Sequence, residues 1–280
     1  MKRLVWLLRL LVFVIFLVFL FINNNYVSLN SEDIKIQNEP QMSEAVTVLQ
    51  LSDFHGKVFS TKQRKLTLMF DRLDYDVVAL TGDVVDENTK NFTFIEFLLA
   101  YFKDRDKPVL FVTGNHEGAN PLYPELETLM NSYGVIMLDN DVYKYNSGGQ
   151  EVTFVGLSDP NVTAYDTSLP IVNGYLEEVA NANGKSVVLS HRPAVISDLR
   201  GKADVILSGH NHGGQIRLPF IGGIISPEEG WFPTYDYGLF AETDTQTGKT
   251  TSMYVSKGLG NSVIPIRLFN FPEVALLTIQ

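Results

Sequence analysis

Residues 46–55 (VTVLQLSDFH) join an apolar, strand-like run to a short polar motif that ends in Asp53-Phe54-His55. Four more apolar runs lead into motifs of the same kind. These motifs are Thr81-Gly82-Asp83-Val84-Val85-Asp86, Gly114-Asn115-His116-Glu117, Ser190-His191-Arg192 and Gly209-His210-Asn211-His212. The chain has five histidines, and all of them lie in these motifs. Because open α/β sheets place their ligand sites where strands end, the pattern predicts one metal centre built from five loops.

The segments between the motifs alternate between helix-like and strand-like patterns. Leu66, Met69, Phe70 and Leu73 follow the spacing of an amphipathic helix. Two further helices are expected at 92–102 and 122–133, and two closing strands at 253–256 and 274–279. Such alternation predicts a sheet-centred α/β domain over residues 45–280.

The N-terminus predicts a membrane anchor. Lys2 and Arg3 precede an apolar stretch from Leu4 to Ile22 that is interrupted only by Arg9, long enough to cross a hydrocarbon core of roughly 30 Å. A cleaved signal peptide is the alternative, but the stretch ends without the small residues that a cleavage site needs. We therefore expect an uncleaved, single-pass signal anchor over residues 1–22, followed by a linker over 23–44. The positive-inside rule then places the N-terminus in the cytoplasm and the catalytic domain outside, at the cell membrane.

Composition excludes several classes of function. The net charge is −10, and beyond residue 9 the chain carries 19 basic against 32 acidic residues. A body of that charge would not attract nucleic acid through its general field, so no nucleic-acid partner is expected. The chain has no cysteine, which excludes disulfides, thiolate nucleophiles and cysteine-ligated zinc.

The residue types in the motifs suit divalent metal ions. Asp53 and His55 supply an oxygen and a nitrogen ligand two positions apart, and the Asp83 carboxylate has two oxygens that could bridge two ions. Asp86, one helical turn later, could orient a neighbouring imidazole. Each of these aspartates could instead cap a helix or fill a turn.

The later motifs add the remaining candidate ligands. The Asn115 side-chain oxygen is an acceptable ligand beside stronger anionic ones. His210 and His212 lie two positions apart in an extended segment, so each could serve a different ion. Trp231 and Phe232 lie in an aromatic segment rich in proline and glycine, which could be a packed loop or an apolar wall that receives a lipid chain or a base.

The five motifs, in this order, resemble the signature of the calcineurin-like metallophosphoesterases over about residues 45–280. The resemblance implies a four-layer α/β/β/α sandwich with the metal ions at one edge of the sheets. It also implies a first metal held by Asp53, His55 and His212, a second held by Asn115, His191 and His210, and Asp83 bridging both. The two divalent ions would be Mn²⁺, Fe or Zn²⁺.

Two segments resemble one branch of this family more closely. Residues 209–216, and residues 258–262 together with 265–270, look like the membrane-associated bacterial phosphodiesterases, which include enzymes similar to the UDP-2,3-diacylglucosamine pyrophosphohydrolases. Glu87 marks a departure, because the phosphoprotein phosphatases have an arginine at this position. The missing arginine disfavours a protein-phosphatase activity.

The resemblance implies hydrolysis by a metal-bridged hydroxide that attacks phosphorus. His116 would act near the leaving oxygen as general acid or charge stabiliser, and Asp86 would fix its tautomer and raise its pKa. We expect a membrane-anchored phosphodiesterase or pyrophosphatase whose phosphoester substrate is lipid- or envelope-linked. An extracytoplasmic site would separate it from nucleotide-linked lipid precursors in the cytoplasm. The alternatives are a phosphomonoesterase with the same metal centre and a non-catalytic, metal-stabilised binding domain.

Overall fold

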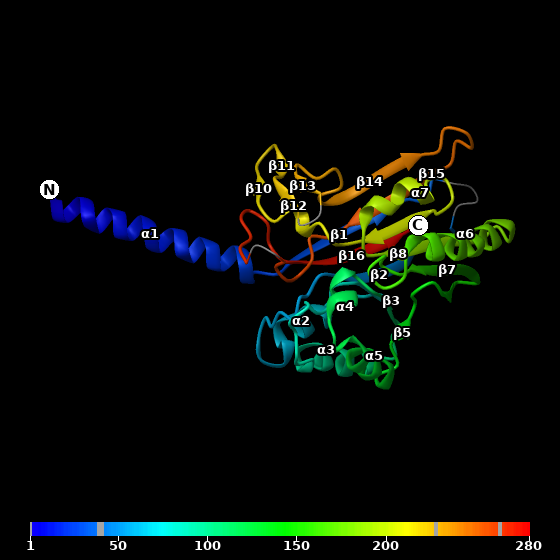
Figure 1. Cartoon of the computed structure of the whole chain (residues 1–280), viewed down its shortest axis with the longest axis horizontal. Coiled ribbons are helices and arrows are strands. Elements are labelled where there is room, and N and C mark those ends of the chain that lie inside the picture. The colour runs from blue at the N-terminus through cyan, green and yellow to red at the C-terminus, as the bar shows by residue number, and fades with distance from the viewer. Residues whose placement is uncertain (1, 38–41, 227–228, 263–264) are drawn as a thin grey trace.

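Two six-stranded sheets lie face to face in the body of the protein, and helices cover both of their outer faces (Figure 1). The computed structural model describes residues 2–37, 42–226, 229–262 and 265–280. Three separate apolar clusters fill the three interfaces between these four layers. The predicted α/β/β/α sandwich is therefore confirmed.

The first sheet has the strand order β1-β16-β2-β3-β4-β5. Strands β2 to β5 run parallel, β16 is antiparallel to β2, and β1 lies parallel to β16 at the edge. The strands are β1 (Ser28–Ile34), β2 (Val46–Leu51), β3 (Val77–Thr81), β4 (Val109–Val112), β5 (Ile136–Met137) and β16 (Glu273–Ile279). Strands β3 and β4 are buried at every position, as expected for parallel strands that are covered on both faces.

The second sheet has the strand order β14-β15-β9-β8-β7-β6. Its four central strands are parallel, and each edge strand is antiparallel to its neighbour. The strands are β6 (Val142–Ser147), β7 (Gln150–Leu157), β8 (Lys185–Ser190), β9 (Val205–Ser208), β14 (Gly238–Thr243) and β15 (Thr250–Val255). Between β9 and β14 the chain forms two small hairpins, β10 (Arg217–Leu218) with β11 (Gly222–Gly223) and β12 (Ile225–Ser226) with β13 (Gly230–Trp231).

Helices pack on each sheet through one apolar face. The helix α3 (Thr93–Lys103) buries Phe94, Leu98 and Phe102, which fall on one side of a helix of period 3.6. Helices α2 (Arg64–Phe70) and α5 (Tyr123–Ser132) lie on the same side, and α6 (Tyr165–Asn181) and α7 (Ile196–Leu199) cover the second sheet (Figure 1). The short elements are α4 (Asn115–Ala119) and the 3-10 turns Thr61–Gln63, Pro193–Val195 and His212–Gly214. The helices expected at 92–102 and 122–133 are confirmed.

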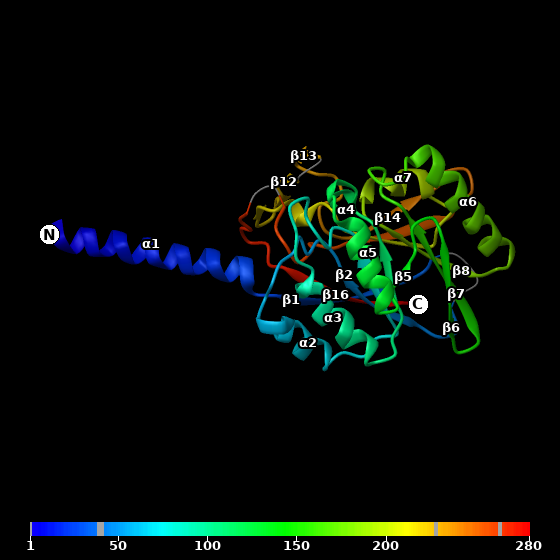
Figure 2. The same ribbon diagram turned by 60° about the horizontal axis from the view of Figure 1, so that its bottom comes forward.

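The N-terminal helix α1 (Lys2–Asn25) projects from the body and is long and apolar enough to cross a membrane (Figures 1 and 2). It ends three residues after the expected boundary at Ile22. The side-chain amides of Asn23, Asn24 and Asn25 each donate a hydrogen bond to the carbonyl four residues earlier, at 2.8–2.9 Å. These bonds use the amide N–H groups of the three asparagines, which lie along the last turn of the helix.

The structure differs from the expected linker over residues 23–44, because part of it forms strand β1. Ser28 to Ile34 pair in parallel register with Glu273 to Ile279, and Val27, Ile34 and Ile36 are buried. The strand was not visible in the sequence because its half-buried face is mostly polar, with Ser28, Asn30 and Glu32, and because it lies at a sheet edge. Residues 38–41 of the expected linker lie outside the described residues.

The position of β1 predicts where the body begins. A chain that starts at Tyr26 should keep a cooperative fold, whereas a chain that starts at Ala45 should lose about 5 kcal/mol or more of unfolding free energy. The loss follows because three buried apolar side chains disappear and the edge of β16 becomes unpaired. Thermal unfolding of the two truncated chains provides the measurement. Equal midpoints would show that β1 contributes nothing to the stability of the body.

Candidate metal centre

The five polar motifs meet where the two sheets adjoin. Asp53 and His55 follow β2, Asp83 follows β3, Asn115 and His116 follow β4, His191 follows β8, and His210 and His212 follow β9. Strands β2, β3 and β4 run parallel to one another in the first sheet, and β8 and β9 run parallel in the second, so the carboxyl ends within each sheet lie at the same edge. The structure therefore brings the predicted ligands of both sheets into one region.

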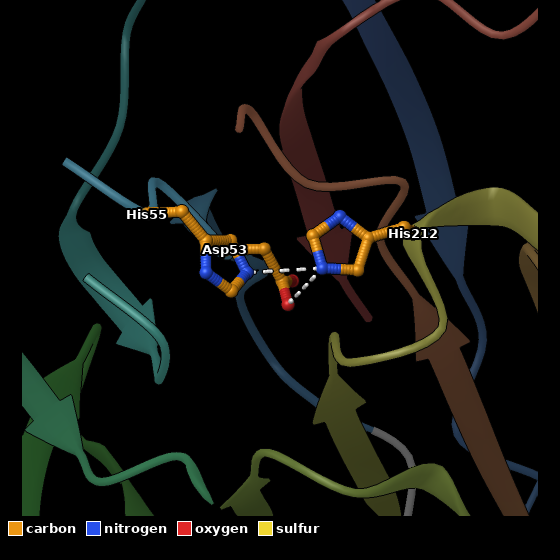
Figure 3. A group of neighbouring side chains, drawn as sticks. All are labelled: Asp53, His55 and His212. Carbon is orange, nitrogen blue, oxygen red and sulfur yellow. Dashed lines mark hydrogen bonds and ion pairs between the residues drawn. The ribbon is translucent and has the colours of Figure 1, made fainter. Parts of the chain in front are cut away.

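Asp53, His55 and His212 form a first group of possible metal ligands (Figure 3). The Nε2 atoms of His55 and His212 lie 3.0 Å apart, and His212 Nε2 lies 3.4 Å from Asp53 Oδ1. Figure 3 shows the two rings directed toward each other from different loops. All three residues are buried.

Asp83, His191 and His210 form a second group. His191 Nε2 lies 3.1 Å from Asp83 Oδ2 and 3.1 Å from His210 Nδ1. The other ring nitrogen of His191, Nδ1, faces the carbonyl of Thr81 at 2.8 Å and would donate to it. That bond fixes the tautomer and leaves Nε2 as the atom available to a cation.

The Asp83 carboxylate lies between the two groups. Its Oδ2 atom is 3.1 Å from His191 Nε2 and 3.6 Å from His55 Nε2. Its Oδ1 atom accepts a hydrogen bond from the backbone N–H of His116 at 2.9 Å. The geometry fits the predicted bridging role, since one carboxylate reaches a nitrogen from each group.

Asn115 and His116 border the second group on the β4 side. The Asn115 Oδ1 atom is buried and has no hydrogen-bond partner, as expected for an oxygen directed at a cation. Of the five histidines, His116 alone is not buried. Its Nε2 atom lies 3.9 Å from Asp83 Oδ2, and its ring meets His55 edge to face at 4.7 Å.

Asp86 and His116 are not hydrogen bonded in the structure. An oxygen of the Asp86 carboxylate accepts from the backbone N–H of Asn88 at 2.7 Å, which closes a local turn. The Nδ1 atom of His116 is buried without a hydrogen-bond partner. The expected pairing of these two side chains is thus absent from this structure, and the carboxylate serves the turn that follows β3.

Most of the candidate ligands have an unusual backbone conformation. Asp53, His55, Asp83, His210 and His212 all have φ between 48° and 71°, the left-handed region that residues other than glycine rarely adopt. Each such residue costs about 1 kcal/mol or more unless its surroundings hold it in place. Their concentration in one site marks it as functional.

Two of the motifs require glycine at one position because neighbouring side chains approach the backbone closely there. A methyl group at Gly114 would overlap Oδ1 of Asp83, and one at Gly209 would overlap the side chains of Ser52 and Asp53. Any larger residue at either position would displace a candidate ligand. This explains why glycine precedes Asn115 and His210 in their motifs.

Glu117 has a structural role that the sequence did not reveal. Its Oε2 atom accepts hydrogen bonds from the backbone N–H groups of Asp83 at 2.8 Å and Gly114 at 2.7 Å. Burial, together with the nearby Asp83 carboxylate, raises the pKa of Glu117 to about 8. Glu117 thereby joins the loops after β3 and β4.

Arg267 is a second residue whose role sequence reasoning missed. Its guanidinium is fully buried, and Nη2 lies 3.3 Å from Nδ1 of His212, the nitrogen that faces away from Asp53. The same Nη2 atom donates to the carbonyl of Lys257 at 2.8 Å. Arg267 comes more than fifty residues after His212 in the sequence, so no local motif signals their contact.

The donor set fits two divalent ions. It consists of imidazole nitrogens, carboxylate oxygens and one amide oxygen, which suit Mn²⁺, Fe and Zn²⁺ alike. Nitrogen ligands about 2.1 Å from one ion stand about 3 Å apart when the angle between them is near 90°. The nitrogen pairs of His55 with His212 and of His191 with His210 have this separation.

Proton competition at His191 predicts a pH-dependent metal affinity. Burial lowers the pKa of His191, but Asp83 more than offsets it and raises the pKa to about 10, whereas burial lowers that of His55 to about 4. Between pH 6.5 and 10 a cation must therefore displace a proton from His191, and the affinity for the metal should rise by at most about tenfold per pH unit.

The His191–Asp83 ion pair stabilises the metal-free fold below pH 6.5, and this contribution to stability is lost as the pH rises through about 10.

Calorimetric titration with Mn²⁺ in buffers of different ionisation enthalpy would measure both the affinity and the protons released. We expect one proton released per chain near pH 7.5. An affinity that does not change between pH 6.5 and 9 would contradict the assignment of His191 as a ligand.

Comparison with known families identifies the domain. Residues 46–214 match the family model described as calcineurin-like phosphoesterase, a range that includes all five motifs. An uncharacterized metallophosphoesterase of Bacillus subtilis, YkoQ, is 28% identical over 271 residues, which cover 95% of this chain and 96% of that protein. A second one from the same organism, YkuE, is 27% identical over 249 residues, covering 86% of this chain and 81% of that protein.

Two further similarities concern the helix and the fold. A Bos taurus protein named as a transmembrane protein with a metallophosphoesterase domain is 26% identical over 262 residues, covering 89% of this chain and 56% of that protein. The NAD nucleotidase of Haemophilus influenzae superposes with a TM-score of 0.52 at 15% identity, over 77% of this chain and 51% of that chain, which shows a shared fold. None of these four names or titles mentions a diacylglucosamine substrate, so that closer resemblance stays a prediction.

Proposed function

The chain belongs to the calcineurin-like phosphoesterase family, and on that premise we propose that it is a membrane-anchored phosphodiesterase or pyrophosphatase. Family membership makes it a metal-dependent phosphoester hydrolase. The proposal adds the ligand assignment, the type of ester and the anchor. A first ion would be held by Asp53, His55 and His212 and a second by Asn115, His191 and His210, with Asp83 shared.

The position of Asp83 carries this assignment, because its Oδ2 atom reaches His55 from one group and His191 from the other. The unpartnered Asn115 Oδ1 atom provides independent support. When bound, two divalent ions acidify a water molecule and polarise the phosphoryl oxygens.

His116 is the residue that we assign to the leaving group. It is the most exposed of the five histidines, and its backbone N–H anchors it to Asp83. A protonated His116 at this border could donate its Nε2 proton to the oxygen that leaves. The buried histidines have no comparable access to a substrate.

The charges around the centre favour a diester over a monoester. A phosphate monoester carries up to one more negative charge than a diester and needs more cationic contacts. The Arg192 guanidinium, which follows His191, already pairs with Asp159 through Nε at 2.7 Å and Nη2 at 3.2 Å. Arg267 is buried among carbonyls, and Glu87 occupies the position where protein phosphatases have an arginine.

Metal analysis and a substrate comparison test the proposal on the full-length protein in detergent. We expect two ions per chain and faster hydrolysis of bis-p-nitrophenyl phosphate than of p-nitrophenyl phosphate. A preference for the monoester would establish the phosphomonoesterase alternative. A folded, metal-loaded protein that hydrolyses neither would support the non-catalytic binding domain.

We also propose that α1 anchors the body outside the cytoplasm with its N-terminus inside. The helix is the one described segment long and apolar enough to cross a membrane, and its first residues are basic. Because the chain lacks cysteine, a single Glu125→Cys variant places one thiol on an exposed site of the body. A membrane-impermeant maleimide should label it in intact cells, and labelling only after lysis would reverse the topology. A lipid- or envelope-linked phosphoester is the substrate class that this location favours.

A further inference from the structure

An exposed apolar surface lies on the body beside the point where α1 leaves it. We call it the membrane-proximal surface. It consists of exposed side chains on the β10–β13 hairpins and on the loop before β16, namely Leu218, Phe220, Ile221, Trp231, Phe232, Ile266 and Phe269. Phe220 is fully exposed and Trp231 is 71% exposed. Figures 1 and 2 show these hairpins on the side of the body from which α1 projects.

The loop before β16 contacts the apolar part of α1 directly. The rings of Phe269 and Phe19 are 5.1 Å apart, and those of Tyr26 and Phe271 are 5.5 Å apart. Phe19 lies six residues before the end of α1 at Asn25, which corresponds to about 9 Å along the helix axis. Phe269 therefore extends past the end of α1 toward the segment that would lie in the bilayer.

Hydrogen bonds hold this loop and the end of α1 together. The Asn24 side-chain oxygen accepts from the backbone N–H of Arg267 at 2.9 Å and from the Asn261 amide at 3.1 Å. The last carbonyls of α1 accept from two lysines, Lys57 at Asn24 and Lys65 at Asn25. Cations at a helix C-terminus stabilise the helix. The hydrogen bonds from both sides of the helix end fix the angle between α1 and the body.

The hairpins are attached to the same loop and to the metal centre. The backbone N–H of Arg217 donates to the carbonyl of Leu268 at 2.9 Å, and that of Leu268 donates to Gln215 at 3.2 Å. Arg217 follows closely after His212, and the Asn211 amide donates to the carbonyl of Tyr235 at 2.9 Å. The apolar hairpins, the helix end and a metal-ligand loop thus form one continuous unit.

We propose that the membrane-proximal surface inserts into the headgroup region of a lipid bilayer as a second contact beside α1. The sequence from Leu218 to Ile225 has no charged residue, although several of its side chains are exposed. Tryptophan and other aromatic residues favour the membrane–water interface, where Trp231 and Phe232 would lie. The inference rests on the proposed anchor, and it places the loop that carries His210 and His212 close to the lipid surface.

The chain allows a direct test because it contains two tryptophans, Trp6 in α1 and Trp231 in the surface. In a Trp6→Phe variant, Trp231 is the single tryptophan. The full-length protein is placed in phosphatidylcholine–phosphatidylglycerol nanodiscs at one copy per disc, with a spin label on either the headgroup or the deep acyl chain. We expect the headgroup label to reduce Trp231 fluorescence at least twofold, and the deep label to reduce it less.

The Trp231→Phe variant, which retains Trp6, reports on the anchor in the same discs. If Trp6 is not quenched, the proposed anchor fails. If Trp6 is quenched and Trp231 is not, the anchor stands and this inference is overturned. Blue-shifted Trp231 emission without quenching by lipid would show that protein covers the surface, which also overturns it.

A matched pair of variants separates insertion from general proximity. Phe220→Ser combined with Phe232→Ser should reduce the quenching of Trp231 at least twofold, since the neighbouring apolar side chains are lost. Ile171→Ser removes an exposed apolar side chain from α6, outside the surface, and should leave the quenching unchanged. Equal quenching in both variants would contradict insertion through these residues.

Discussion

Replacing His116 with asparagine is expected to lower turnover about 100-fold to 10,000-fold while two metal ions remain bound. The imidazole lies at the border of the centre with Nε2 3.9 Å from Asp83 Oδ2. It lies with His55 and Asp83 in a third group that could hold a metal ion, but it is not among the seven ligands that the family resemblance implies. Asparagine retains the backbone N–H that bonds Asp83 and removes the group that would protonate the leaving oxygen. The rate with an alkyl phosphodiester, whose leaving oxygen needs a proton, and the metal content of the same sample provide the measurements.

The choice of leaving group gives this prediction a second readout. A substrate with a good leaving group, such as p-nitrophenolate, needs little protonation, so the variant should be less impaired with it than with an alkyl ester. Loss of both ions together with activity would show that His116 is instead a ligand. An equal loss with both esters would contradict the role of general acid.

Asp86→Asn serves as the comparison for His116. The sequence predicts that Asp86 orients His116, but the structure shows its carboxylate bonded to the backbone of Asn88. From this contact we expect less than a threefold change in turnover. A loss similar to that of the His116 variant would show that the two side chains pair during the reaction.

The sequence predicts the strands of the body that carry the motifs because they are buried on both faces and are therefore continuous apolar runs. It does not predict β1, whose half-buried face is mostly polar, or α6, in which Pro170 and Gly174 interrupt the helical pattern. In both cases tertiary packing stabilises an element whose local signal is weak. The family resemblance supplied the layer order that periodicity alone could not.

The sequence likewise predicts only some of the residues that form the candidate site. Seven candidate ligands were identifiable because their residue types are unusual at strand ends, and the structure groups six of them by short distances and leaves the oxygen of the seventh, Asn115, unpartnered. Glu117 and Arg267 were not identifiable, because a buried carboxylate that accepts backbone N–H groups and a buried guanidinium have no sequence pattern of their own. Only the fold places Arg267 beside His212.

Asp83→Asn is expected to weaken metal binding more than His116→Asn does. We expect at least a 100-fold loss of affinity for the second ion and no measurable turnover. The Asp83 carboxylate is buried, and burial raises its pKa, but nearby histidines led by His191 more than offset this and keep it ionised. A neutral amide keeps the oxygen that bonds His116 and loses the negative charge that both groups share. Isothermal titration with Mn²⁺ and the metal content after dialysis measure the loss.

The pH dependence of the same variant distinguishes the bridging role from simple destabilisation. Without the Asp83 charge, burial should dominate at His191, so its pKa should fall and the proton released on Mn²⁺ binding near pH 7.5 should disappear. Asp159→Asn is the matched control, because it also neutralises a buried carboxylate, one that pairs with Arg192 and contributes less than Asp83 to the raised pKa of His191. That control should retain two ions and the proton release. If Asp83→Asn retained both ions with unchanged affinity, the two groups would not share a carboxylate, and the centre would have to be described as two separate sites.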